Sequence, residues 1–124
     1  MAGEQILVVE DNQKNMKLLR DLLQATGYRT LEASTAGQAL MLATEHGPAL
    51  VLLDIRLPDM DGLVVLRRLR MDERTASIPV LAVSAQAMKG DRERFKEAGF
   101  DGYVSKPIDI DELLATVARH CGGV

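Results

Sequence analysis

The sequence predicts an α/β fold of the (βα)5 type, in which five parallel strands alternate with five helices. Five short apolar runs recur along the 124 residues, and a helical pattern of apolar residues follows each run after a short connection. Strands that alternate with helices imply a doubly wound five-stranded parallel sheet with right-handed crossovers and helices on both faces. No linker, low-complexity segment or repeat interrupts the pattern, so we expect one domain over residues 1–124.

Three of the predicted strands are apolar on both faces, which is typical of central strands in a parallel sheet. They are residues 6–9 (ILVV), 50–53 (LVLL) and 79–83 (PVLAV). Residues 29–33 (RTLEA) alternate between apolar and polar side chains, a pattern that indicates an edge strand. Residues 102–104 (GYV) give the fifth strand.

Apolar residues at helical spacing predict the five helices. The apolar faces are Met16, Leu18, Leu19, Leu22 and Leu23 in the first helix, Ala39, Leu40, Leu42 and Ala43 in the second, Leu63, Leu66, Leu69 and Met71 in the third, Phe95 and Ala98 in the fourth, and Ile110, Leu113, Leu114 and Val117 in the fifth. We expect Ser34 or Thr35 to be the N-cap of the second helix and Asp91 that of the fourth. Gly27 and Gly99 mark the ends of the first and fourth helices.

Composition and charge exclude several classes of protein. The chain is 47% hydrophobic, which suits a globular core, and its net charge of -3 gives no electrostatic footprint for nucleic acid. The one basic cluster, residues 67–70 (RRLR), is interpreted as a solvated helix face. The N-terminus lacks the features of a signal peptide, and no apolar run approaches the roughly 20 residues that span a bilayer. We therefore expect a cytoplasmic protein that binds neither nucleic acid nor membranes. The single cysteine, Cys121, allows no internal disulfide and is interpreted as a small core residue.

Polar side chains follow four of the predicted strands at the point where each strand ends. Glu10 and Asp11 follow the first strand, Asp54 the third, Ser84 the fourth and Lys106 the fifth. Because the carboxyl ends of parallel strands meet at one edge of a sheet, these side chains are expected to lie together. Asp59 and Asp61, by contrast, lie beyond Pro58 in the connecting loop and are interpreted as turn residues.

The residue types at this edge suit phosphoryl chemistry. Three carboxylates repel one another unless a cation lies among them, and a small number of hard oxygen ligands suits Mg²⁺. Lys106 brings a second positive charge and Ser84 a hydroxyl, so an incoming phosphoryl group would be neutralised on every side. Asp54, in the middle, is then the natural nucleophile and would form an aspartyl phosphate.

Other phosphate or metal motifs fail when they are tested against the sequence. An EF-hand loop with its obligatory glycine at Gly62 would begin at Leu57 and end at Arg68, neither of which is an acid. A flavin site would need a phosphate cradle after the first strand, where residues 10–12 (EDN) would repel a phosphate. The glycine-rich motifs of P-loop and dinucleotide-binding proteins are absent from the sequence.

Four segments carry a resemblance to a known family. They are ILVVEDN (6–12), LVLLDIRLPDMDG (50–62), PVLAVSA (79–85) and GYVSKP (102–107). With them the chain resembles the bacterial two-component response-regulator receiver domain of the CheY-like superfamily. Within that family it is similar to DivK-type single-domain cell-cycle regulators and to the receivers of hybrid kinases. The resemblance covers the whole chain and implies the flavodoxin-like receiver fold with strand order 2-1-3-4-5.

The resemblance also implies a role for each residue of the edge. Asp54 would be the phosphoacceptor, and Lys106 would pair first with Asp54 and then with the phosphoryl oxygens. Mg²⁺, for which Mn²⁺ would be an acceptable substitute, would bind Glu10, Asp11, Asp54 and the backbone carbonyl of Arg56. Ser84 and Tyr103 would be the switch residues, Arg56 and Gln86 would tune the phosphoryl lifetime, and the bond before Pro107 would be cis.

The first functional hypothesis is therefore a phosphorylation-activated signalling switch, not a turnover enzyme, with no output domain of its own. A receiver cut from a hybrid kinase is the open alternative to a stand-alone module. Its partners would be an upstream histidine kinase or histidine phosphotransferase, which docks on the first helix and the Pro107 loop, and a downstream protein that binds the surface of residues 88–119. The module would be a monomer or a weak dimer.

The alternative hypothesis is a Mg²⁺-dependent phosphohydrolase of the haloacid-dehalogenase type. That group also uses an aspartate nucleophile, Mg²⁺, a hydroxyl and a lysine, but it expects a second aspartate two residues after the nucleophile. Arg56 occupies that position here, and no cap insert follows. Turnover of a generic phosphomonoester discriminates the two hypotheses.

Overall fold

The computed structural model describes residues 3–85 and 91–121, and within them the predicted strands and helices are present. The strands are β1 (Gln5–Val9), β2 (Arg29–Ala33), β3 (Leu50–Asp54), β4 (Val80–Ser84) and β5 (Gly102–Ser105). The helices are α1 (Gln13–Ala25), α2 (Ala36–His46), α3 (Gly62–Met71), α4 (Asp91–Ala98) and α5 (Ile110–His120). No helix among the described residues is long and apolar enough to cross a membrane.

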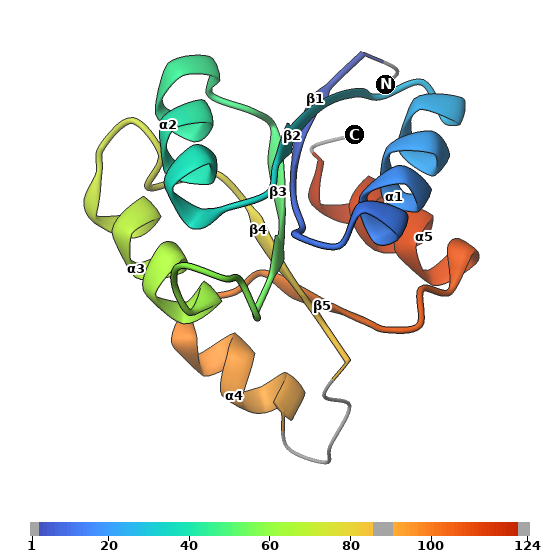
Figure 1. The fold of residues 1–124 in the computed structure, drawn as a ribbon. Helices are drawn as coiled ribbons and strands as arrows, with labels where there is room; N and C mark the ends of the chain where they lie inside the picture. The colour runs from blue at the N-terminus through green and yellow to red at the C-terminus, as the bar shows by residue number, and fades with distance from the viewer. Residues whose placement is uncertain (1–2, 86–90, 122–124) are drawn as a thin grey trace.

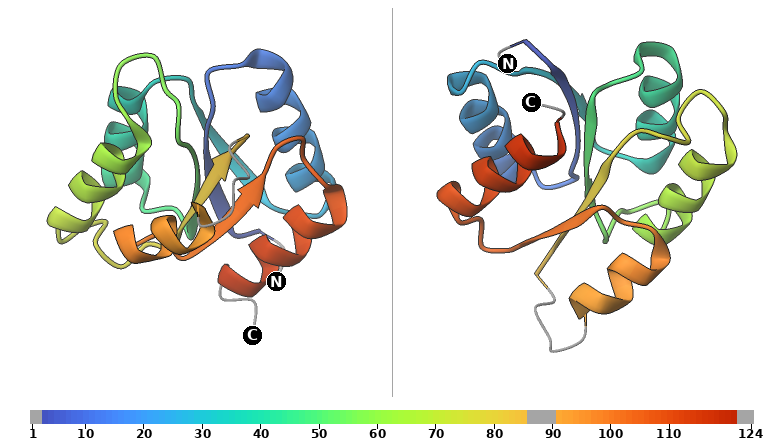
Figure 2. Two further views of the ribbon diagram at one scale, coloured as in Figure 1. Left: turned by 90° about the horizontal axis from the view of Figure 1, so that it is seen from below. Right: turned by 180° about the vertical axis from the view of Figure 1, so that it is seen from behind.

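The five strands form one parallel sheet in the order β2-β1-β3-β4-β5, which confirms the predicted fold (Figure 1). Helices α2, α3 and α4 cover one face, and α1 and α5 cover the other (Figures 1 and 2). The strand order changes direction between β1 and β3, so the carboxyl ends of these two strands frame the point where ligands bind in open α/β sheets.

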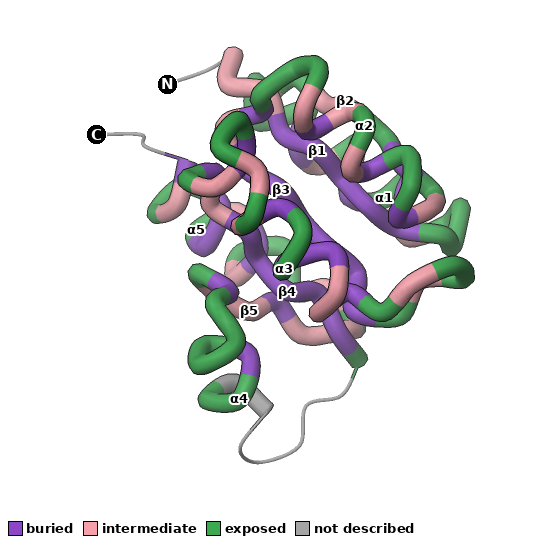
Figure 3. Tube along the Cα trace, turned by 90° about the vertical axis from the view of Figure 1, so that its left-hand side faces the viewer, coloured by how far each residue is buried: buried purple, intermediate pink, exposed green. Residues whose placement is uncertain are grey.

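Side chains alternate along each central strand between two separate cores. Leu7 and Val9 of β1 pack with α2, α3 and α4, whereas Ile6 and Val8 pack with α1 and α5. This alternation follows from the period of two in a strand. All of β3 and β4 is buried, which explains why both read as continuous apolar runs (Figure 3).

Four of the predicted core residues are exposed instead. Leu18, Met71 and Ile110 are 39%, 78% and 48% exposed, and Ala98 is also exposed. Each lies on a helix outside the stripe that faces the sheet, which in α1 contains Met16, Leu19 and Leu23. The prediction that these four residues line buried helix faces was therefore wrong, because the apolar stretches are wider than the stripe that the sheet covers.

The helix ends follow local signals. Of the two candidate N-caps of α2, Thr35 is the cap, since its side chain accepts a hydrogen bond from the backbone N–H of Gln38. Gly27 and Gly99, after α1 and α4, have φ angles of 103° and 113°, a left-handed conformation that favours glycine. Helix α4 begins at Asp91, whose predicted capping side chain lies outside the described part of the structure.

The basic cluster at the end of α3 divides into two kinds of residue. Arg67 and Arg68 are exposed, as predicted for a solvated face. Arg70 instead binds the chain on both sides of β4: its guanidinium donates to the carbonyl of Ile78 at 2.7 Å and pairs with Asp101 at 2.9 Å. Asp101 in turn accepts the backbone N–H of Val80 at 2.8 Å. Arg70 therefore links α3 to the segments that precede β4 and β5, and the prediction of a solvated residue was wrong for it.

Candidate functional site

Four strands deliver polar side chains to one edge of the sheet. Asp54 is the last residue of β3 and is paired in the sheet with Val83, one residue before Ser84. Glu10 follows β1, and Lys106 follows β5. The structure therefore brings together the residues that the sequence placed at the strand ends.

Lys106 bridges two buried carboxylates. Its Nζ lies 2.8 Å from Oε1 of Glu10 and 3.0 Å from Oδ2 of Asp54. The other oxygen of Asp54, Oδ1, accepts a hydrogen bond from the backbone N–H of Arg56 at 2.9 Å. Glu10 and Asp54 are only 2% and 5% exposed. These contacts hold the Asp54 carboxylate in one orientation at the end of β3.

Burial and mutual repulsion perturb the charges of this group. Burial raises the pKa of the Glu10 carboxyl, and the neighbouring Asp54 adds to the rise, although the nearby ammonium group of Lys106 opposes it. Burial alone would lower the pKa of Lys106, but the two carboxylates together outweigh it and raise that pKa. The group contains three carboxyl side chains and one lysine, so Lys106 alone does not match the acidic residues in number.

The carboxylates are arranged as metal ligands. Glu10, Asp11 and Asp54 each present an oxygen, and these oxygens lie within 4.8 Å of one another. Oε1 of Glu10 is buried and forms no hydrogen bond, although Lys106 lies close to it. Asp11 is exposed, so solvent reaches the cluster. Few oxygen ligands with access for water fit Mg²⁺, which keeps several of its waters when it binds.

Ser84 and Tyr103 lie beside this group. Ser84 is buried at the end of β4, and its carbonyl accepts hydrogen bonds from the backbone N–H of Lys106 at 2.9 Å and from the Tyr103 hydroxyl at 3.4 Å. The half-buried Tyr103 ring stacks on Phe95 of α4, with 5.6 Å between ring centroids. Tyr103 thus connects the end of β4 to α4.

The remaining predicted site residues surround the same edge. Arg56 is exposed and lines a cleft of about 490 Å³ together with Arg94 and Phe95. The peptide bond between Lys106 and Pro107 is cis. Gln86 lies outside the described residues.

Asp61 and Asp59 do more than form a turn. Asp61 is the N-cap of α3, since its side chain accepts the N–H of Leu63 at 2.8 Å. Asp59 accepts hydrogen bonds from the N–H groups of Ala36 and Gly37 at 2.8 and 3.2 Å, so it caps α2 from a distant loop. An aspartate directly before a helical pattern is a known start signal that could have identified Asp61. No local signal identifies Asp59, because its partners lie 22 and 23 residues away.

Removing the Asp59 carboxylate is expected to destabilise the fold. The hydrogen bond from Ala36, then that from Gly37, lowers the pKa of Asp59, so its contribution is present above the ordinary aspartate pKa and is lost as the pH falls through the depressed folded value. Asp59→Ala should lower the urea midpoint at pH 7, and the difference from wild type should shrink on acidification. Thr35→Ala removes the other cap of α2 at a cost of about 1 kcal/mol, and the loss of stability in Asp59→Ala can be compared with this value. Equal midpoints for wild type and Asp59→Ala at pH 7 would contradict the capping role.

Comparisons with known proteins agree with this geometry. Residues 6–118 match the response regulator receiver domain family. The polar-differentiation response regulator DivK of Brucella ovis is 47% identical over 117 residues, which cover 94% of this chain and 95% of that protein. The receiver domain of a sensor histidine kinase from Pseudomonas aeruginosa, solved with a magnesium ion in its active-site cleft, is 36% identical with a TM-score of 0.89 and covers 98% of this chain and 99% of its own.

The chain therefore belongs to the response regulator receiver domains, which are signalling modules controlled by phosphorylation. Within this family it is DivK-like. The comparisons give no support to the alternative of a haloacid-dehalogenase-type phosphohydrolase.

Proposed function

We propose that Asp54 is the phosphoacceptor of this receiver domain. The observation that carries the proposal is the bridge of Lys106 between Asp54 and Glu10, with Asp11 beside them. Asp54 is the member of the group at the end of the central strand β3, and both of its oxygens have a hydrogen-bond donor. An oriented carboxylate with a lysine at 3.0 Å suits nucleophilic attack on phosphorus.

In the proposed reaction an Asp54 oxygen attacks the phosphorus of a phosphohistidine. A new oxygen–phosphorus bond forms as the phosphorus–nitrogen bond of the donor breaks, and the electron pair of that bond stays on the imidazole. The product carries about -1.5 to -2 additional charges. Lys106 pairs with Asp54 before transfer and with a phosphoryl oxygen afterwards, and the Ser84 hydroxyl provides a further donor at the end of β4.

The proposed metal ligands are Glu10, Asp11, Asp54 and the backbone carbonyl of Arg56, for Mg²⁺ or Mn²⁺. When it is bound, the ion supplies the positive charge that the carboxylates lack and screens the incoming phosphoryl group. The support comes from the three clustered carboxylates and the buried oxygen of Glu10 that has no hydrogen bond. The magnesium-containing receiver of Pseudomonas aeruginosa adds to it.

Magnesium is expected to stabilise the folded protein. At ten times its dissociation constant, an ion that binds only the folded state adds about 1.4 kcal/mol, which raises the Tm by roughly 3–6 °C. Asp11→Asn, which changes an exposed ligand, should reduce the shift. Calorimetry at constant ionic strength tests this, with NaCl in place of MgCl2 as the control. A shift of the same size in Asp11→Asn would contradict the assigned ligands.

The proposed switch runs from Asp54 to the surface of α4, β5 and α5. Phosphoryl oxygens would draw Ser84 toward Asp54, and Tyr103 would respond, because its hydroxyl contacts the Ser84 carbonyl and its ring contacts Phe95 of α4. A near-complete change of state needs about 5.5 kcal/mol of differential interaction, so Ser84, Lys106 and the metal ion must act together. Arg56, at the rim, and Gln86 would set the access of the attacking water.

The proposed partners are an upstream histidine kinase or histidine phosphotransferase and a downstream target that binds the α4-β5-α5 surface. The domain would act as a signalling module without turnover of a substrate, in the cytoplasm, where donors are phosphorylated with ATP. The likeness to Brucella ovis DivK, at 47% identity over 117 residues, supports a role in the cell cycle.

The direct test is intact-mass analysis after incubation with acetyl phosphate, with and without Mg²⁺. One phosphoryl adduct that requires Mg²⁺ supports the proposal, and its absence with a phosphorylated histidine phosphotransferase as donor would contradict it. Steady turnover of a generic phosphomonoester would contradict the assignment as a module that is not an enzyme.

A further inference from the structure

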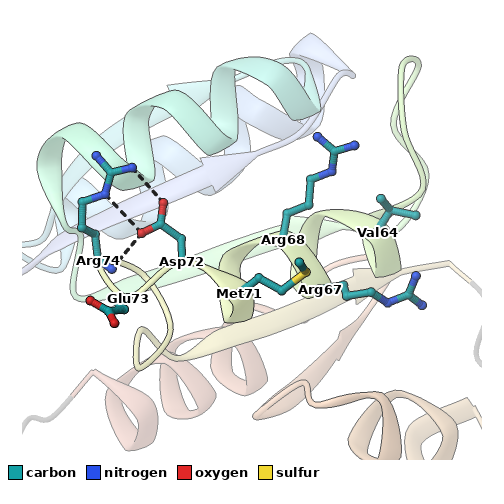
Figure 4. Close-up of a pocket in the computed structure, with 7 residues that line it drawn as sticks. All are labelled: Val64, Arg67, Arg68, Met71, Asp72, Glu73 and Arg74. Atoms are coloured by element: carbon teal, nitrogen blue, oxygen red, sulfur yellow. Dashed lines mark hydrogen bonds and ion pairs between the residues drawn. The ribbon is translucent and has the colours of Figure 1, made fainter.

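The outer face of α3 carries an exposed methionine. Met71, the last residue of α3, is 78% exposed, the largest value among the exposed large hydrophobic residues of the described structure. Val64, Arg67 and Arg68 precede it at helical spacing and share this face. Together with Asp72, Glu73 and Arg74 they line a shallow depression of about 910 Å³ (Figure 4). We call these seven residues the α3 patch.

Charges of opposite sign lie at the two ends of the α3 patch. Arg67 and Arg68 are exposed at one end and have no ion-pair partner among the described residues, whereas Asp72 and Arg74 at the other end pair with each other at 2.9 Å. Glu73, beside that pair, is exposed and also has no partner within the described structure. Figure 4 shows Met71 between Glu73 on one side and Arg67 on the other.

We propose that the α3 patch is a self-association surface, whose partner is a second copy of this chain. A single exposed methionine is ordinary on a protein surface. The patch differs because Arg67 and Glu73, which have no ion-pair partner among the described residues, lie on opposite sides of the methionine, so the surface is complementary to itself. A two-fold axis that passes through Met71 at right angles to α3 makes the two helices antiparallel. It places Glu73 of each copy opposite Arg67 of the other, and the two Met71 side chains in contact.

The proposed dimer is weak and reversible. One helix face buries less than the roughly 1,000 Å² of a stable interface, so we expect association in the high micromolar range. The rim ion pairs fix the register and add little affinity. The α3 patch contains none of the residues assigned to phosphoryl transfer or to the switch, so the inference stands apart from the proposed function.

Sedimentation velocity over a wide concentration range tests the proposal. Wild type should show a monomer–dimer equilibrium. Arg67→Glu and Glu73→Arg, which each bring like charges together, should weaken it about tenfold. The double variant restores opposite charges and should return to within about threefold of wild type. A wild type that stays monomeric at millimolar concentration overturns the proposal, as does a dimer that neither single charge change weakens.

Cross-linking tests the position of the two-fold axis. Met71→Cys should form a disulfide-linked dimer under mild oxidation, because a residue on the axis meets its own copy within the Cα–Cα reach of about 4.4–6.8 Å. Met41→Cys on α2 is the matched control, since Met41 is also an exposed helical methionine, and the native Cys121 is buried. Cross-linking of Met71→Cys no faster than that of Met41→Cys would place the contact elsewhere and overturn the assignment.

Discussion

Asp54→Asn is expected to abolish the phosphoryl adduct completely. Asparagine keeps the size of the side chain and the carbonyl that accepts the N–H of Arg56, but its neutral amide is not a nucleophile for phosphorus. The fold should be retained, because the change removes a charge that raises the pKa of Glu10 and leaves Lys106 with its contact to Glu10. The loss of the adduct would then be chemical and not a result of unfolding.

Intact mass after treatment with acetyl phosphate and Mg²⁺ gives the readout. Asp59→Asn is the matched control, since it neutralises a carboxylate in the loop after β3 that points to α2 and not to Lys106. This control should form the adduct as wild type does. An adduct on the Asp54→Asn protein would move the phosphoacceptor to another residue, and its loss in both proteins would point to a disturbed loop.

The sequence predicted the central part of the site because each of its residues directly follows a strand. Asp54 and Lys106 are separated by 52 residues, yet both lie at the carboxyl ends of parallel strands, and that arrangement determines their neighbourhood. Because β3 and β4 are buried along their whole length, their sequences are continuous apolar runs, and the first polar residue after each run indicates where the strand ends. Where strands position a side chain, the strand pattern is sufficient to place it.

Residues whose roles depend on packing between distant loops could not be predicted in this way. Arg70 was assigned to solvent because its neighbours in sequence are basic, while its partners lie up to 31 residues away. Asp59 was assigned to a turn because it follows Pro58 in a loop, while its partners lie 23 and 22 residues away. Met71 of α3 is exposed although it continues the apolar pattern, because the sheet covers only the stripe of Val65, Leu66 and Leu69. Local pattern gives the period of a helix but not the width of the face that its neighbours cover.

Lys106→Met is expected to destabilise the protein strongly at neutral pH. The change leaves two buried carboxylates, on Glu10 and Asp54, without the ammonium group that lies 2.8 and 3.0 Å from them. Breaking a buried ion pair by removing one partner costs about 3 kcal/mol, and protonation of a carboxyl reduces this loss. The Lys106 side chain is only 18% exposed, so solvent screens its interaction with the two carboxylates weakly.

The pH dependence of this loss follows from the pKa of Glu10, which burial, and then repulsion from Asp54, already raises in the wild type. Without Lys106 the folded-state pKa rises further, so the folded state holds a proton that the unfolded state releases. The folded state is then favoured below the unfolded pKa, and this contribution is lost as the pH rises through the folded pKa. In urea denaturation, the free energies of unfolding of wild type and Lys106→Met should therefore differ little near pH 4 and strongly at pH 7.

The effect of Mg²⁺ on the stability of Lys106→Met is a second test of the charge imbalance. An ion held by the same carboxylates replaces the missing positive charge, so Mg²⁺ should raise the urea midpoint of Lys106→Met more than that of wild type. Lys17→Met, which removes only an exposed ion pair with Asp21 on α1, should show a much smaller pH dependence and no enhanced Mg²⁺ effect. If Lys106→Met lost the same stability at both pH values and gained nothing extra from Mg²⁺, the negative charge of Glu10 and Asp54 would not be the cause. The role of Lys106 would then be one of packing and not of charge.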